Sequence, residues 1–216
     1  MKKYFLFAAM AITAITTSVS FNSCRKGEED PAISLRSRKA RLAGEWNLTA
    51  GKDDQTQNSS VSTTTYDGTN KIVTSNGQSD TTGYTNKMVI NGDGTYTSTS
   101  VTTTKYVFWS FTQTTVETTE ENGTWDFNSG LGDEKAKTKV LMHPVKNVTT
   151  TVTTTNGSTT TNISTDEYTS NSFDYSMYLT RLSNKELKFT IEYNEPTTGS
   201  SSSSSTWTGT RTYTAQ

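Results

Sequence analysis

The sequence predicts an all-β fold in which antiparallel strands form a barrel or a sandwich. Large apolar side chains recur at every second position in several segments, which is the period of a half-buried strand. Threonine, a β-branched residue that favours strands, makes up about a fifth of the 216 residues. Dipeptides that tolerate a positive φ, such as Asn76-Gly77 and Asn156-Gly157, separate these segments at hairpin spacing. No long helical pattern follows residue 42, so about nine or ten strands are expected.

The first 23 residues have the features of a lipoprotein signal peptide. Lys2 and Lys3 form a positive region, an apolar run extends from residue 4 to about residue 15, and small residues continue up to Ser23. Cys24, the only cysteine of the chain, follows directly. We interpret residues 1–23 as the signal and Cys24 as the lipidated residue that attaches the chain to a membrane. The alternative is an ordinary secretory signal followed by an incidental cysteine.

Residues 24–40 are expected to tether a domain of residues 41–216 to that membrane. The first part of the tether is charged and contains Pro31, as is typical of a linker. The segment from Ser34 to Leu42 has leucines about two helical turns apart and predicts a short helix. Its basic residues either face water or meet anionic lipid headgroups, and a solvated helix face is the preferred interpretation. They are Arg36, Arg38, Lys39 and Arg41.

The middle of the domain contains short strand-like segments. They are Met88 to Ile90, Thr95 to Val101, Tyr106 to Phe111, Trp125 to Phe127 and Val140 to Met142. Two polar segments, Val148 to Thr155 and Ser158 to Ser164, flank Asn156-Gly157 and carry little apolar mass. We expect this polar hairpin to protrude or to lie at a sheet edge, where water-facing threonines oppose edge pairing.

The clearest local pattern predicts a hairpin near the C-terminus, with its turn at residues 183–185. Its apolar face comprises Phe173, Tyr175, Met177, Leu179, Leu187, Phe189, Ile191 and Tyr193. In the last strand, one face comprises Trp207, Arg211, Tyr213 and Ala215, and threonines occupy the other. One packed and one solvated face is typical of antiparallel sheet.

Charge and patterning exclude two classes of protein. Removing Lys2 and Lys3 from the 20 basic residues leaves 18 against 21 acidic residues, a net charge near −3. This balance argues against nucleic-acid binding, which requires a clustered basic surface. The strands turn threonine outward, which argues against a membrane-spanning barrel with its apolar outer band.

Gly44-Glu45-Trp46 opens the first predicted strand directly after the predicted helix. Together with Asn91–Tyr96, Gly123–Phe127 and Leu179–Leu187, this Gly-x-Trp motif resembles lipocalin-like domain lipoproteins of the Bacteroidota. The resemblance covers most of the mature chain. It implies a lipocalin-like antiparallel up-and-down β-barrel, here with long Thr-rich hairpins and a short N-terminal helix.

The resemblance also implies roles for three residues in closing the barrel. In that family the motif tryptophan, here Trp46, plugs one end, and the motif glycine, here Gly44, lets the preceding segment cross closely beneath it. An arginine in a late strand packs across the tryptophan. Arg211 matches this position best, and Arg181 is the rival candidate.

Aromatic side chains raise the question of a ligand cavity. The candidate lining residues are Tyr96, Trp109, Phe111, Trp125, Phe173, Tyr175 and Phe189. The same side chains would also serve to fill a solidly packed small barrel. A cavity of roughly 300 Å³ or more, closed at the Trp46 end, would favour binding of a small, partly apolar ligand.

The sequence contains no recognisable catalytic constellation. His143 is the only histidine, and we interpret it as a loop or strand-end residue. With Cys24 lipidated, neither a Cys–His pair nor a zinc site with several Cys or His ligands can form. Adjacent carboxylates are interpreted as solvated turn residues rather than as an acid pair for glycoside hydrolysis. We therefore expect no enzyme, no metal site and no cofactor.

The sequence thus predicts a lipoprotein anchored at the outer membrane, either periplasmic or surface-exposed. The preferred hypothesis is a structural or interaction role toward envelope proteins or glycans. The alternative hypothesis is binding of a small, partly apolar ligand in the barrel.

Overall fold

The computed structural model describes residue 30 and residues 36–57, 60–128, 138–168, 174–195 and 205–216. Within these residues the chain is all-β apart from one short helix, α2 (Arg38–Leu42). The strands are β1 (Gly44–Gln57), β2 (Ser60–Tyr66), β3 (Asn70–Ser75), β4 (Gln78–Ile90), β5 (Thr95–Phe108), β6 (Phe111–Phe127), β7 (Lys139–Thr155), β8 (Ser158–Glu167), β9 (Tyr175–Leu182), β10 (Glu186–Glu195) and β11 (Ser205–Ala215). The all-β prediction is confirmed; the signal segment, Cys24 and Phe173 lie outside the described residues. In the described part of the chain, no helix is both long and apolar enough to span a bilayer.

All the described strands belong to one antiparallel sheet that closes into a ring. Hydrogen bonding follows the order β6-β5-β4-β3-β2-β1-β11-β10-β9-β7-β8, and pairings of β6 with β7 and of β4 with β1 complete the circuit. At its end next to α2, the ring bypasses the β2–β3 hairpin, because Gly44–Asn47 of β1 pairs directly with Lys87–Ile90 of β4. It also bypasses β8, because β7 pairs with β9 over residues 139–142. Ring neighbours therefore follow chain order once β2, β3 and β8 are set aside.

The apolar core lies at the end of the ring next to α2, which we call the closed end. Inward positions alternate with outward ones: Met177 and Leu179 are buried, whereas Tyr178 between them is exposed. This pattern confirms the predicted C-terminal hairpin. The buried core residues are Leu42, Trp46, Leu48, Met88, Ile90, Tyr96, Trp125, Val140, Met142, Met177, Leu179, Leu182, Leu187, Phe189 and Tyr213.

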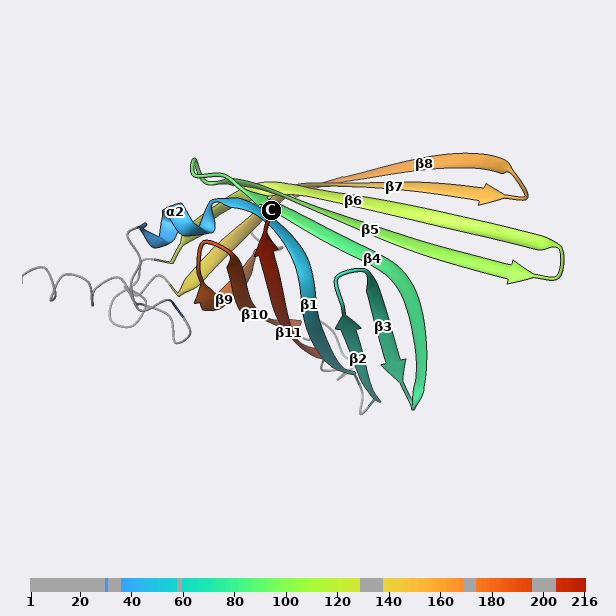
Figure 1. The fold of residues 1–216 in the computed structure, drawn as a ribbon, viewed down its shortest axis with the longest axis horizontal. Coiled ribbons are helices and arrows are strands. Elements are labelled where there is room, and N and C mark those ends of the chain that lie inside the picture. Colours follow the sequence, from blue (N-terminus) through green and yellow to red (C-terminus); the bar gives the residue numbers. More distant parts are fainter. Residues whose placement is uncertain (1–29, 31–35, 58–59, 129–137, 169–173, 196–204) are drawn as a thin grey trace, which may run out of the picture.

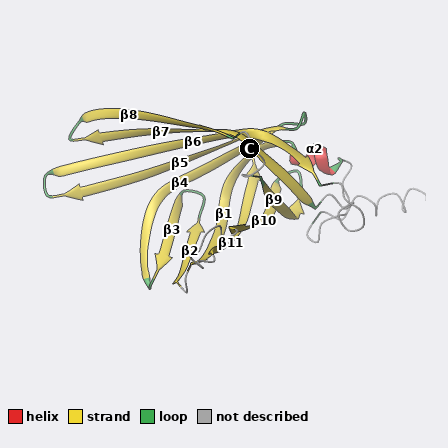
Figure 2. Cartoon of the chain, turned by 180° about the vertical axis from the view of Figure 1, so that it is seen from behind, coloured by secondary structure: helices red, strands yellow, loops and turns green. Residues whose placement is uncertain are grey.

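The outer halves of four strands extend far beyond this core. Figure 1 shows β5, β6, β7 and β8 projecting away from α2 as a long arm, and Figure 2 shows the same arm from behind. We call residues 102–116 and 149–165 the distal arm. β8 is the last strand in the order, and every one of its residues is exposed. The prediction that the Asn156-Gly157 hairpin lies at a sheet edge is confirmed.

Turn chemistry accounts for the hairpin ends, with one departure from expectation. Asn76-Gly77 and Asn156-Gly157 both adopt positive φ at both residues, as two-residue hairpin turns require. Between β5 and β6, however, the turn falls at Trp109, which has a φ of 55°. Tyr106 to Phe111 is therefore the end of a hairpin and not a continuous strand. An aromatic residue in the left-handed region is uncommon and strained.

A buried group of charges joins α2 to the closed end of the ring. Asp30 accepts a hydrogen bond from Arg38 Nη1 at 2.8 Å and another from the Leu182 N–H at 2.8 Å. Arg41 Nη1 donates to the Leu182 carbonyl, and Arg41 Nη2 lies 3.5 Å from Asp30 Oδ2. The expectation that the helix turns its basic residues to water or lipid is wrong for Arg38 and Arg41, because both are buried against Asp30. Arg36 and Lys39 are exposed as expected.

Candidate functional site

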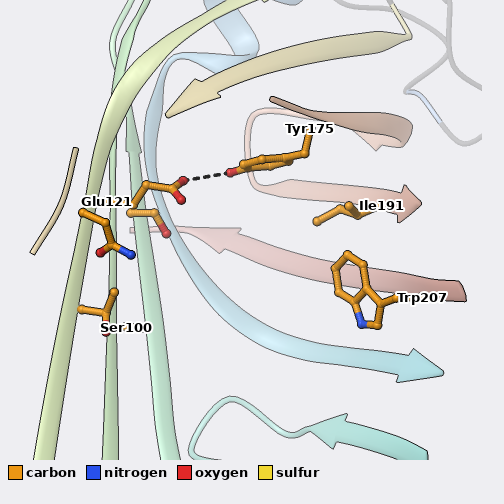
Figure 3. Close-up of a pocket in the computed structure, with 8 residues that line it drawn as sticks. Ser100, Glu121, Tyr175, Ile191 and Trp207 are labelled. Carbon is orange, nitrogen blue, oxygen red and sulfur yellow. Dashed lines mark hydrogen bonds between the residues drawn. The ribbon is translucent and has the colours of Figure 1, made fainter. Parts of the chain in front are cut away.

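A cavity of about 400 Å³ lies inside the ring, between the apolar core and the open end. Figure 3 shows Ser100 and Glu121 on one wall, facing Tyr175, Ile191 and Trp207 on the other. The walls come from six strands, β5, β6, β7, β9, β10 and β11. Among the described residues, the lining consists of Ser98, Ser100, Thr119, Glu121, Asn147, Tyr175, Ile191 and Trp207.

The strand register explains why a cavity forms here. Ser98 pairs with Glu121, and Glu121 pairs with Asn147, so these three side chains form one row across the inner face of β5, β6 and β7. Ser100 pairs with Thr119 in the next row. The polar wall therefore consists mostly of short side chains. Ser98, Ser100 and Thr119 are too short to reach the apolar wall opposite, so the interior stays open beside Glu121, whose longer side chain does reach Tyr175.

A carboxylate and two tyrosine hydroxyls connect this polar wall to the rest of the interior. Glu121 Oε1 accepts hydrogen bonds from Tyr96 Oη at 2.7 Å and from Tyr175 Oη at 3.2 Å. Burial first, and the charge of Glu121 second, raise the pKa of Tyr175. Burial, followed by Tyr175 and Glu121, also raises the pKa of Tyr96. Both hydroxyls therefore keep their protons at neutral pH and act as donors to the carboxylate.

A second charged group lies farther along β1 and β11. Arg211 makes a two-point ion pair with Asp53, Nη1 to Oδ1 at 2.5 Å and Nη2 to Oδ2 at 2.8 Å. Its guanidinium lies 4.5 Å from the ring centre of Tyr66, whose hydroxyl donates to Asp53 Oδ2 at 2.9 Å. Burial lowers the pKa of Arg211, but the hydrogen bond and charge of Asp53 outweigh this effect, and the net pKa is raised. Gly209 makes room for the pair, because a Cβ there would lie 2.5 Å from Asp53 Oδ1.

This position corrects the expected role of Arg211 in closing the ring. Trp46 pairs with Ala215 and Gly51 pairs with Arg211, so Arg211 lies four residues from the register position of Trp46, about 13 Å along β11. The expected packing of Arg211 across Trp46 is therefore wrong. The rival candidate Arg181 pairs with Glu186 through a contact of 2.6 Å.

Gly44 and Trp46 do lie at the closed end, where β1 begins. The indole of Trp46 is buried and donates a hydrogen bond from Nε1 to the Leu42 carbonyl at 2.9 Å. This bond ties the last residue of α2 to the first strand. Lys39 places its ammonium group 5.8 Å from the ring centre of Trp125 on the same side. The basic groups that act at the closed end thus come from α2 rather than from the last strand.

The predicted lining residues divide among three places. Tyr175 lines the cavity, and Tyr96 reaches it through its hydrogen bond to Glu121. Trp125 and Phe189 are buried in the core, where Phe189 stacks on Tyr213 at a centroid distance of 5.7 Å. Their expected place in the cavity wall is therefore wrong, and both side chains fill the core, which is the alternative expected for a solidly packed barrel.

Trp109 and Phe111 occupy the third place, the end of the β5–β6 hairpin, far from the cavity. Trp109 is 90% exposed, and Tyr106, Val107 and Phe108 are all more than half exposed. We call Tyr106–Trp109 with Phe111 the aromatic tip. Assigning Trp109 and Phe111 to a cavity was wrong, because the strand carries them beyond the ring and onto the distal arm.

Sequence reasoning missed the whole polar wall, and it also missed Ile191 and Trp207 as lining residues. A signal for Trp207 was present in the sequence, because the period-two pattern of the last strand places it on the same face as Tyr213. Glu121 and Asn147 had no comparable signal. Both lie among threonines, and only the β6–β7 register brings them next to each other.

His143 lies on β7 away from the cavity lining. Its Nδ1 is 2.6 Å from Asp174 Oδ2, and its Nε2 is 3.7 Å from Asp126 Oδ2. No group of three or more metal-ligating side chains occurs among the described residues.

Comparisons with family models, curated proteins and solved structures returned no match to this chain.

Proposed function

We propose that this chain is a lipid-anchored, lipocalin-like protein of the outer membrane whose β-barrel binds a small, partly apolar ligand. The observation that carries this proposal is the cavity of about 400 Å³ inside the ring. Small-molecule sites occupy about 300–1,000 Å³ and combine apolar walls with a few convergent polar groups. Tyr175, Ile191 and Trp207 supply the apolar side, and Glu121 supplies a polar anchor. Binding, rather than catalysis, is the activity that this set of side chains supports.

Two further observations support the barrel part of the proposal. The order of strands around the ring follows the chain, as in an up-and-down barrel, when β2, β3 and β8 are set aside. Gly44 and Trp46 begin β1 at the closed end, below a short helix. The lipid anchor rests on the signal segment and Cys24. It would hold the domain at the periplasmic or the outer surface of the membrane.

The binding proposal is tested with N-phenyl-1-naphthylamine, an uncharged apolar fluorophore. The full chain should raise its fluorescence in a saturable way. Ser100→Trp places a large ring in the cavity and should abolish this binding. Thr160→Trp, on exposed β8, is the matched control and should bind as the native chain does. Equal binding by both variants, or no binding by the native chain, would contradict the proposal.

The anchor is tested separately by mass spectrometry of the chain extracted from native membranes. The proposal expects an acylated Cys24 at the mature N-terminus. A mature chain that carries a free Cys24 thiol, or that is cleaved elsewhere, would contradict the anchor and would leave the cavity proposal intact.

The aromatic tip favours a second candidate function, an interaction role at the cell envelope. Tyr106 and Phe111 form an edge-to-face pair with ring centroids 6.5 Å apart, and the ring centroids of Phe108 and Trp109 are 6.1 Å apart. Asn156 fixes the base of the tip: it donates its N–H to the Thr112 carbonyl at 3.0 Å and accepts from the Thr112 N–H at 3.0 Å. An exposed aromatic group on a fixed hairpin is typical of a contact surface for another molecule.

A photo-crosslinking residue at position 109 tests this role in living cells. The interaction role predicts a discrete crosslinked product from position 109. Position 160, exposed on the neighbouring hairpin, is the control and should give none. The same result at both positions would argue against a specific contact at the tip.

A further inference from the structure

One carboxylate in the cavity has no cationic partner in the described part of the chain. Both hydrogen bonds to Glu121, from Tyr96 and Tyr175, end on Oε1. Neither hydroxyl carries a positive charge. The other inward carboxylate nearby, Asp53, is neutralised by Arg211. Glu121 is partly buried, and a partly buried carboxylate without a cation is a site where an incoming positive charge would be stabilised.

The residue next to Glu121 adds a second unsatisfied acceptor. Asn147 pairs with Glu121 across β6 and β7, so the two side chains share the inner face. The buried Asn147 Oδ1 has no hydrogen-bond partner among the described residues. An acceptor that is buried and unpaired costs about 1–3 kcal/mol. A ligand that supplied donors to this row would remove that cost.

The same cross-strand row is acidic beyond the cavity. Asn147 also pairs with Asp166 of β8, which is exposed at the edge of the sheet. The row therefore runs from Ser98 through Glu121 and Asn147 to Asp166. It contains two carboxylates and no basic residue. A field of this sign attracts cations and repels anions at the cavity.

The opposite wall is suited to a flat apolar body. Trp207 and Tyr175 offer aromatic surfaces, and Ile191 lies between them in Figure 3. Tryptophan faces attract cations as well as apolar rings. The space between the walls, about 400 Å³, falls within the range for a small organic molecule.

We propose that the cavity binds a small organic amine, whose ammonium group donates to Glu121 and to Asn147 Oδ1 while its apolar body packs against Trp207, Ile191 and Tyr175. This inference rests on the proposed binding function and names the class of ligand. An anionic head group would meet Glu121 with the wrong sign. A neutral head group would leave the carboxylate without a counter-charge.

Calorimetric titration with three probes of similar shape tests the ligand class. They are 2-phenylethylammonium, 2-phenylethanol and 3-phenylpropionate, and the NMR signal of the Trp207 indole N–H reports where each binds. The native chain should bind the ammonium probe at least tenfold more tightly than the alcohol, and the carboxylate probe most weakly. Equal affinity for the ammonium and alcohol probes would overturn the amine inference. It would leave the binding function standing.

Glu121→Gln sharpens the test, because glutamine still accepts from Tyr96 and Tyr175 but carries no charge. This variant should bind the ammonium probe at least tenfold more weakly and the alcohol unchanged. Glu120→Gln is the matched control, because Glu120 is exposed, accepts from Asn122 Nδ2 at 2.9 Å and does not line the cavity. If Glu121→Gln fails to fold, the comparison of probes on the native chain still decides. Failure of all probes and of the apolar fluorophore would overturn the binding function itself.

Discussion

The closed end and the distal arm are built from the same strands but have opposite characters. On β5, Tyr96 is 2% exposed at the closed end, whereas Tyr106 is 55% exposed on the arm. On β6, Trp125 is 4% exposed, and Phe111 lies at the aromatic tip. Backbone pairing between β5 and β6 continues without a break from one region to the other. Hydrogen bonding therefore extends the sheet, and the presence of an opposite wall decides where side chains form a core.

The cavity lies where these two regions meet. Toward the closed end, large inward side chains fill the ring, and toward the arm, threonines and serines replace them. This arrangement separates the residues that hold the fold from those available for recognition. Substitutions in the two regions should therefore differ in kind, with stability lost at the closed end and binding lost beyond it.

The largest expected effect is the loss of the motif tryptophan. Trp46→Ala removes a buried ring and its hydrogen bond to Leu42, so we expect a loss of about 3–5 kcal/mol in unfolding free energy. Trp109→Ala, at the 90% exposed position, is the matched control and should change it by less than about 0.5 kcal/mol. Urea unfolding followed by far-UV circular dichroism measures both. Similar losses of unfolding free energy for the two variants would show that the closed end and the distal arm contribute equally to stability.

The second-largest loss of unfolding free energy is expected at the buried charge group of Asp30, Arg38 and Arg41. Asp30→Ala removes the carboxylate between Arg38 and Arg41, both buried, and we expect a loss of about 3 kcal/mol. Lys87→Ala breaks the exposed pair with Glu45 and should cost less than about 1 kcal/mol. Thermal unfolding of both variants beside the native chain provides the comparison. A small effect of Asp30→Ala would show that this charge group does not stabilise the packing of α2 on the closed end.

A smaller loss is expected at the boundary between core and cavity. A Cβ on Gly123 would lie 2.3 Å from the His143 carbonyl and 2.7 Å from Tyr96 Cε1. Gly123→Ala should therefore shift Tyr96 and cost about 1–3 kcal/mol. Gly92→Ala is the matched control, since nothing lies within 4 Å of its Cβ position. Unfolding of both variants in urea tests the difference, and equal stability would argue against tight packing of Tyr96 on β6.

The smallest expected effect on stability is the pH-dependent contribution of Asp67 in the β2–β3 turn. Backbone N–H groups of Thr69 and Asn70 donate to Asp67 Oδ1 at 2.9 and 2.7 Å, and these bonds hold the pKa of Asp67 well below its ordinary value of 3.8. A lowered folded pKa adds stability above pH 3.8, and that contribution is lost as the pH falls through the folded value. NMR titration of the Asp67 carboxyl carbon should show protonation well below pH 3.8. Titration at the ordinary value would contradict these hydrogen bonds.

Local features of the fold could be predicted from the sequence, and non-local ones could not. Period-two patterns identified the C-terminal hairpin, and Asn156-Gly157 identified the β7–β8 turn, because both signals lie within a few residues. The turn at Trp109 was missed because Tyr106 to Phe111 is rich in strand-forming residues and contains no Gly, Asn or Asp.

The candidate site was harder to predict because strand register decides its members. The register shifts between Leu48 and Ala50 on β1, where one strand carries an extra residue. Such a bulge changes which positions face inward, and beyond it Asp53 meets Arg211 inside the ring. Glu121 and Asn147 likewise become neighbours only through the pairing of β6 with β7. No short-range pattern contains this information.

Native-state amide hydrogen exchange tests most directly whether the closed end holds the fold and the distal arm does not. Amides of Leu48, Phe189 and Tyr213 should exchange only through global unfolding. Amides of residues 151–161 in the β7–β8 hairpin should exchange orders of magnitude faster, although they belong to the same sheet. Uniform protection across both regions, or stronger protection in the hairpin, would show that the closed end does not hold the fold.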